Sequence, residues 1–259
     1  MEGFIIQLNS LIPGFIANMC AGLVIFARML GFVRFAPVLN RKEIPGLVKL
    51  GLSFLLTLIF LPLVNAQGQP AHGDLLLALL LNAAAGMIIG YMAQLILAAI
   101  EAGGDMINMQ MGLSSAMVLD PTTSSQVSIL GRFFGVLGIV IFLQIGGAYW
   151  LFQAIDKSFE IFPIYASTIP LNKLVNMDYL ISLSSNVLYM GLQIASPVLL
   201  ATLGQDIILG VISKTAPQVN VFQLSFLFKP VFGAAILMWI LPMLINVISD
   251  YFNTFSHII

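Results

Sequence analysis

Charged residues are scarce in this chain: Asp, Glu, Lys and Arg together make up 8% of its 259 residues, whereas hydrophobic residues make up 59%. A soluble domain typically carries about 25% charged residues, so this chain has too little polar surface to cover itself in water. The formal net charge is −1 and no basic tail or patch is present, which argues against nucleic acid as a partner. We therefore expect an integral membrane protein or a subunit buried in a membrane-associated assembly.

Residues that hold metals or act as nucleophiles are also scarce. The single cysteine, Cys20, excludes an internal disulfide and a cysteine-cluster metal site. The two histidines, His72 and His257, are too few and too far apart to indicate a metal centre. The serines come without a nucleophile elbow or a partner histidine, and no phosphate-binding glycine loop occurs. We therefore predict that the protein is not an enzyme and uses no cofactor.

Six apolar stretches stand out at roughly the ~20 residues that a helix needs to cross a bilayer. No linker or charge block separates them, and they cover about 11–33, 46–66, 75–100, 127–155, 179–204 and 231–249. The first stretch lacks the basic start and the small-x-small site of a cleaved signal, so we expect it to stay in the mature protein. The predicted fold is an all-α, membrane-associated bundle of helical hairpins in a single domain, with a broken central loop.

Basic residues are distributed unequally between alternate loops. One side would hold seven of them and the other only Lys157 and Lys173, so the positive-inside rule predicts that both termini lie outside the cytoplasm. Asn, Gln, Arg and Pro residues also interrupt the apolar stretches, as is more typical of helices packed against protein than of helices facing lipid. Gly86-x-x-x-Gly90 and Gly131-x-x-x-Gly135 predict close helix packing, either within this chain or against another subunit.

The stretch from Glu101 to Arg132 differs from its apolar surroundings. Its two acids and the pair Gly103-Gly104 predict an interruption of the preceding helix. Glu101 and Asp105 would share a face if the helix continued, which would favour a proton or ion relay; otherwise both would lie in a hydrated mouth. Ionisable residues inside apolar stretches are functional candidates by default, and here they are Arg28, Glu101, Asp105 and Asp206.

Methionines and a turn signal follow the acids. Four methionines fall between Met106 and Met117, and their deformable thioethers suit either a constriction or ordinary core packing. Asp120-Pro121 and the hydroxyl residues after it predict a turn. Towards the C-terminus, Pro217 and Asn220 predict a second turn after a helix that ends near Lys214, with the next helix starting beyond Lys229-Pro230. That connector is either a docking surface or an ordinary hairpin turn.

Two of these motifs carry a family resemblance. GGDMINMQMGLSSAMVLDPTTSSQ and APQVNVFQLSFLFKP, with the early Arg34-Phe35-Ala36-Pro37, resemble the flagellar biosynthetic R proteins over essentially the whole chain. Relatives of that family in virulence secretion are the T components of the type III export apparatus. The resemblance implies a structural subunit of the flagellar export gate, needed for flagellum assembly, in the bacterial inner membrane and the basal body, much of it on the periplasmic side.

The resemblance also implies partners and a division of the chain. Several copies of two small export proteins, P and Q, would surround one copy of this chain, and the export switch protein B, the export protein A, unfolded flagellar subunits and membrane lipid would contact it. Residues 1–178 would be similar to the P protein, and residues 179–259 would form a C-terminal hairpin similar to the Q protein.

Finally, the resemblance implies roles for single residues. Residues 110–126 would form a plug beneath the channel, and the plug and channel-lining set is Met106, Met109, Gln110, Met111, Gly112, Leu113, Ser114, Met117, Val118, Asp120 and Pro121. The partner contacts would be Pro217, Gln218, Asn220 and Phe222. The competing interpretations are a virulence-type T component and, with less support, a solute or ion transporter with a broken helix at 101–126. The sequence shows no internal repeat of the kind that such transporters carry.

Overall fold

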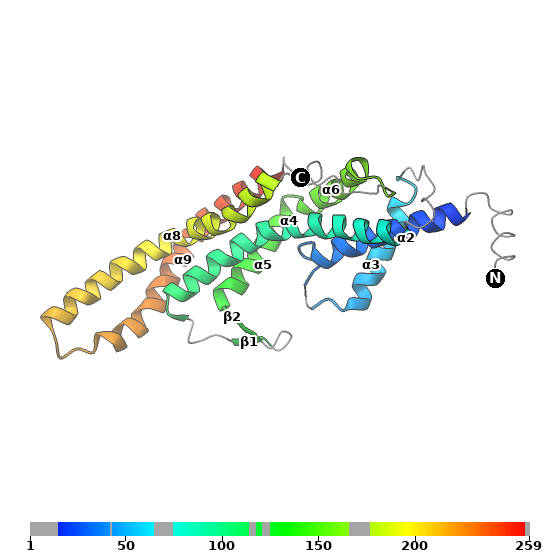
Figure 1. Ribbon diagram of the computed structural model, residues 1–259. Helices are drawn as coiled ribbons and strands as arrows, with labels where there is room; N and C mark the ends of the chain where they lie inside the picture. The colour runs from blue at the N-terminus through cyan, green and yellow to red at the C-terminus, as the bar shows by residue number, and fades with distance from the viewer. Residues whose placement is uncertain are drawn as a thin grey trace. The chain divides into compact units, whose positions relative to one another are not determined.

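The computed structural model describes residues 15–41, 43–64, 75–113, 118–120, 125–165 and 177–256. The all-α prediction is confirmed, because every one of the six apolar stretches coincides with helix (Figure 1). Val118 to Val127 adds a small antiparallel ribbon in which Val118 pairs with Val127 and Asp120 with Ser125. The elements are α2 (Phe15–Phe35), α3 (Gly46–Phe60), α4 (Leu75–Gln110), β1 (Val118–Asp120), β2 (Ser125–Val127), α5 (Ile129–Gln144), α6 (Gly147–Ile161), α8 (Met177–Thr215) and α9 (Val221–Ser256).

Within the described residues, the helices that are long and apolar enough to cross a membrane are fewer than the six apolar stretches. Three qualify, in α4, α8 and α9, and a fourth is reached if α5 and α6 form one broken span. The break between α5 and α6 lies at Gly146, whose φ of +84° suits a residue without Cβ. Helix α3 has 15 residues and is too short to cross a bilayer core of about 30 Å.

The chain divides into two compact units. The first consists of Met1–Gln94 and Tyr149–Leu180, and the second of Leu95–Ala148 and Ile181–Ile259. In the first unit, α2 packs against α3 and against the early part of α4, and its buried face includes Val24, Ile25 and Phe32. Helices α2 and α4 approach so closely that a Cβ on Gly86 would collide with the Arg28 carbonyl oxygen and lie 2.9 Å from Phe32 N. The predicted close packing at Gly86 is thus confirmed, and it lies within this chain.

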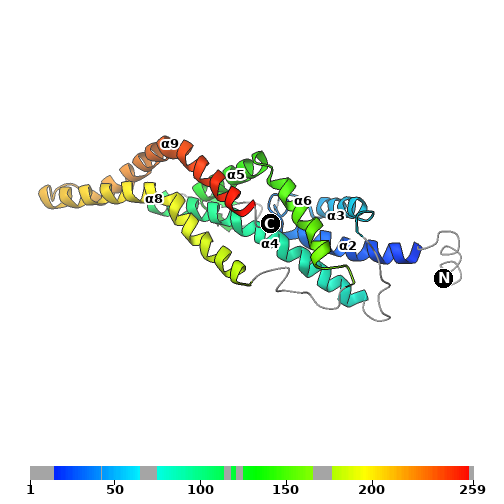
Figure 2. The same ribbon diagram turned by 90° about the horizontal axis from the view of Figure 1, so that it is seen from above.

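The second unit combines the end of α4 with α5, α8 and α9. Helices α8 and α9 run side by side as a long hairpin (Figures 1 and 2). Helix α8 contains Pro197, and α9 contains Pro230 and Pro242. Phe142 of α5 packs against Phe252 of α9, with the rings tilted and their centres 5.4 Å apart. The expected start of the last helix beyond Pro230 is wrong, because α9 begins at Val221 and continues through that proline.

Candidate functional site

The predicted interruption of the helix at Glu101–Asp105 is wrong. Helix α4 continues without a break to Gln110. Just beyond its end, Gly112 takes a φ of +73° that favours glycine. Gly103 and Gly104 are instead places where other helices approach closely. A Cβ on Gly104 would lie 2.6 Å from the Leu130 carbonyl oxygen of α5, and one on Gly103 would lie 3.0 Å from Ile194 of α8. The missing side chains therefore allow packing rather than a break.

The end of α4 is joined to the start of α5 by a group of side chains that we call the Asp105 clasp: Asp105, Asn108, Ser128 and Gly131. The Ser128 hydroxyl donates to Asp105 Oδ1 and accepts a hydrogen bond of 2.8 Å from the Gly131 backbone N–H. Ser128 is thereby the N-cap of α5, an arrangement that satisfies one of the unpaired amides of the first helical turn. The clasp thus brackets the central segment, because Asp105 precedes that segment and Ser128 follows it.

Asn108 adds a second link between the same two helices. Its side chain is fully buried, and Oδ1 accepts a hydrogen bond of 3.5 Å from the Leu130 backbone N–H. Within the described part of the chain, its Nδ2 has no hydrogen-bond partner. The sequence did not single out Asn108 or Ser128, although a serine directly before an apolar run is a recognised helix-start signal.

The two acids of α4 share one face, as a continuous helix requires, and that face is turned towards α5. A Cβ on Gly131 would collide with Asp105, whereas one on Gly135 would lie 3.7 Å from Glu101 Cδ. Close packing is therefore confirmed at Gly131, while Gly135 has room for a methyl group. The interpretation that placed both acids in a hydrated mouth required a break in the helix at Gly103-Gly104. That break is absent, because α4 is continuous there.

The predicted plug residues occupy different environments. Met109 is 69% exposed, whereas Met111 is 1% exposed and packs on Gly233 of α9, where an added Cβ would lie 2.6 Å from Met111 Cγ. Met106, Gln110 and Leu113 are partly exposed. Val118 and Asp120 belong to β1, while Ser114, Met117 and Pro121 lie outside the described residues. The two strands reverse the chain between Asp120 and Ser125.

The C-terminal turn is shorter than predicted and spans residues 216–220. All four predicted contact residues are exposed, and Phe222 reaches 82% exposure in the first turn of α9. Asn220 Oδ1 accepts a hydrogen bond of 3.3 Å from the Gln223 backbone N–H, so Asn220 caps α9. This residue therefore has a structural task in addition to any contact that it makes.

Asp206 is paired in a way that the sequence did not reveal. Its carboxylate lies 2.8 Å from Lys229 Nζ, which joins α8 to α9 part of the way along the hairpin. Both side chains are partly exposed, at 37% for Asp206 and 22% for Lys229. The ion pair links the two helices at one point along the hairpin.

Arg28 lies at the centre of a polar cluster in the first unit, and its side chain is fully buried. It donates hydrogen bonds of 3.0 and 2.6 Å to Asn82 Oδ1, of 3.0 Å to Ser158 Oγ and of 2.6 Å to the Phe162 carbonyl oxygen. The guanidinium also lies 4.1 Å from the centre of the Phe159 ring, a distance suited to a cation–π contact.

The partners of Arg28 are themselves held in place. Asn82 Nδ2 donates to the carbonyl oxygens of Ala78 and Ile164 at 2.8 and 2.9 Å, and Ser158 Oγ donates to Ile155 O at 2.6 Å. All of the oxygens that accept from Arg28 are neutral. A buried cation that is bonded in this way joins α2, α4 and α6, and the cluster offers no nucleophile or acid–base pair.

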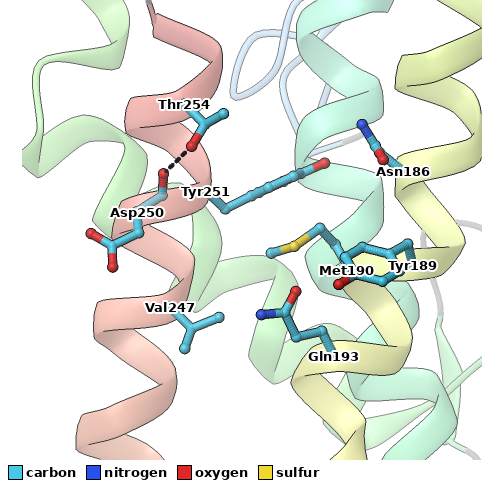
Figure 3. A pocket seen from close by; sticks show the side chains of 8 residues that line it. All are labelled: Asn186, Tyr189, Met190, Gln193, Val247, Asp250, Tyr251 and Thr254. Atoms are coloured by element: carbon cyan, nitrogen blue, oxygen red, sulfur yellow. Dashed lines mark hydrogen bonds between the residues drawn. The ribbon is translucent and has the colours of Figure 1, made fainter.

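A groove of about 330 Å³ lies between α8 and α9 (Figure 3). Tyr251 reaches from α9 towards Asn186 and Met190 of α8, and the Thr254 hydroxyl donates to the Asp250 carbonyl oxygen at 2.9 Å (Figure 3). The remaining lining residues are Tyr189, Gln193 and Val247. Amides, hydroxyls and one carboxylate can bind another protein surface, but they do not form a catalytic arrangement. The described residues also contain no group of three metal-ligating side chains.

Comparison with known proteins relates the chain to bacterial export systems. The model of a family described as bacterial export proteins, family 1, matches residues 19–255. Flagellar biosynthetic protein FliR of Escherichia coli is 28% identical over 238 residues, which cover 90% of each chain. FliR of Pectobacterium carotovorum is 30% identical over 85% of this chain and 83% of its own, and FliR of Bacillus subtilis is 25% identical over 90% of each. The chain therefore belongs to bacterial export proteins, family 1, as a relative of the flagellar biosynthetic FliR proteins.

Proposed function

We propose that this protein is a structural subunit of the flagellar type III export gate, forming with P and Q proteins the inner-membrane channel for unfolded flagellar subunits. The observation that carries the proposal is the match to FliR proteins over 85–90% of the chain, and the name of those proteins assigns them to flagellum biosynthesis. Helices of membrane-spanning length and the wide exposure of large apolar side chains support a subunit that lipid and neighbouring subunits cover.

The test of this function uses a strain of the source bacterium that lacks the gene. We expect such cells to be non-motile and to export no flagellin, with both properties restored by the full chain. Affinity purification of a tagged chain should also recover the P and Q proteins. Normal swimming and export in the deletion strain would refute the proposed function.

The central segment, residues 110–126, is proposed to be the plug of that channel. In support, Met109 offers an exposed apolar side chain, and the clasp holds both ends of the segment together. Because Met111 is buried against Gly233, Met109 is the cleaner probe. Met109→Gly, or deletion of 113–119, should raise the leak of ions and small solutes while the complex with P and Q still assembles.

The matched control for the plug is Met238→Gly. Met238 of α9 is 70% exposed, close to the 69% of Met109, and the two substitutions lose the same side chain. Membrane conductance of cells that carry either variant measures the leak. A Met109→Gly complex that assembles and conducts no more than the Met238→Gly complex would refute the plug function.

We further propose that Phe222 and its neighbours face the export switch protein B and the export protein A on the cytoplasmic side.

A further inference from the structure

An apolar groove of about 400 Å³ lies between α2 and α3 in the first unit. Among the described residues that line it, Thr57 is the one with a hydroxyl, and this hydroxyl already donates to the Ser53 carbonyl oxygen at 2.7 Å. The groove therefore offers a ligand no polar group that lacks a partner. It is lined by Met19, Gly22, Leu23, Phe26, Phe54, Thr57, Leu58 and Leu61.

The groove is open along an exposed apolar rim. Met19, Leu23, Phe54 and Leu58 are 55%, 47%, 56% and 51% exposed, so about half of each side chain remains uncovered. Gly22 also lines the groove, and among the described residues a Cβ there would come within contact distance of Leu61 Cδ1, at 3.8 Å. A flexible hydrocarbon chain suits a groove with this apolar lining.

A group of basic residues lies beyond one end of the groove, in the connection between the two helices. Arg34 lies in the last turn of α2, Arg41 follows in the connection, and Lys49 lies in the first turn of α3. Arg34 is near enough to Lys49 for their charges to repel each other, and within the described residues the acid beside this group is Glu43, 3.8 Å from Arg41. A bound anion would relieve this repulsion.

The spacing between cations and groove matches one amphiphilic molecule. Lys49 precedes Phe54 by five residues and Arg34 follows Phe26 by eight, which correspond to about 7.5 and 12 Å of helix rise. We propose that this groove binds an acyl chain of an anionic phospholipid, with its phosphate beside Arg34, Arg41 and Lys49. Basic residues next to a membrane-embedded surface attract anionic lipids, which gives the site a preference for them over zwitterionic ones.

The test adds phosphatidylglycerol or phosphatidylcholine with identical acyl chains to the purified complex with P and Q and measures bound lipid by native mass spectrometry. The wild-type complex should prefer phosphatidylglycerol. Lys49→Gln should lower that preference about fivefold, whereas Lys157→Gln on α6 should leave it unchanged. Gly22→Phe should reduce retention of both lipids at least tenfold by filling the groove, an order-of-magnitude expectation from the apolar area lost to the ligand. Gly22→Ala, which the 3.8 Å contact permits, should bind like wild type.

Equal binding of the two lipids by the wild type, or an unchanged preference in Lys49→Gln, would overturn the proposal. So would full retention of lipid by an assembled Gly22→Phe complex, or no lipid on the wild type because a neighbouring subunit fills the groove. If Gly22→Phe prevents assembly, the comparison of Lys49→Gln with Lys157→Gln still decides the result, since Lys49 is at the surface and Lys157 is exposed. None of these outcomes depends on flagellar export.

Discussion

Removal of the buried cation at Arg28 should destabilise the first unit strongly. Arg28→Met preserves most of the side-chain volume but removes every donor that reaches Asn82 Oδ1 and Phe162 O. Two buried acceptors then lack partners, and each such loss costs about 1–3 kcal/mol. Ser158 keeps its own bond to Ile155 O and adds little. The free energy of unfolding should therefore fall by about 2–6 kcal/mol.

The assay compares thermal unfolding of variant complexes with P and Q in the same detergent. Arg34→Met is the matched control, because Arg34 lies on the same helix, is exposed and makes one hydrogen bond of 3.0 Å to Asn40 Oδ1. That variant should change stability by no more than about 0.5 kcal/mol.

A double variant tests whether an unpaired acceptor accounts for the lost stability. Asn82→Leu removes the acceptor that Arg28→Met leaves unpaired, so the double variant Arg28→Met/Asn82→Leu should be more stable than the sum of the single effects predicts. This reasoning holds that the buried neutral acceptors require the donors of Arg28. Strictly additive effects of the two substitutions on stability, or an Arg28→Met variant as stable as Arg34→Met, would refute it.

Three further outcomes are expected. Gly131→Ala should destabilise the complex by about 2 kcal/mol, because its Cβ would displace the clasp carboxylate, whereas Gly135→Ala should be neutral; equal stability on thermal unfolding would contradict the clasp. Asp206→Lys should lower the unfolding free energy by about 1 kcal/mol through like-charge contact with Lys229, and Lys229→Asp in the same chain should restore it; failure of the double variant would argue against a register role. Phe222→Ser should weaken binding of protein B in a pull-down while P and Q still co-purify, and loss of P and Q instead would make the residue structural.

The helices could be predicted from the sequence better than their boundaries. Apolar runs mark the helices because each needs a large apolar surface to pack, whatever it packs against. Gly103 and Gly104 misled the prediction because glycine serves equally in a break and in a close helix crossing, and the partner helix decides between them. Pro230 misled the prediction for a similar reason. The preference of proline for the first turn of a helix suggests a helix start there, but α9 already begins after the Asn220 cap.

The polar contacts were beyond sequence reasoning. Arg28 could be recognised as a costly buried charge, but its partner Asn82 lies 54 residues away and Ser158 lies 130 away. The same holds for the ion pair of Asp206 with Lys229, which requires the register of two long helices. Composition constrains what must be buried, while the identity of the neighbour depends on the three-dimensional arrangement.

The Asp105 clasp also sets a tether length. With Asp105 bonded to Ser128, the 16 residues from Gly112 to Val127 connect the end of α4 to the clasp serine. The seven residues from Asp105 to Gly112 add about 10 Å of helix rise. A fully extended chain covers at most about 3.4 Å per residue, so no part of the segment can lie more than about 31 Å from the clasp while the contact is kept. The clasp therefore limits how far any part of the central segment can lie from the start of α5 while Asp105 stays bonded to Ser128.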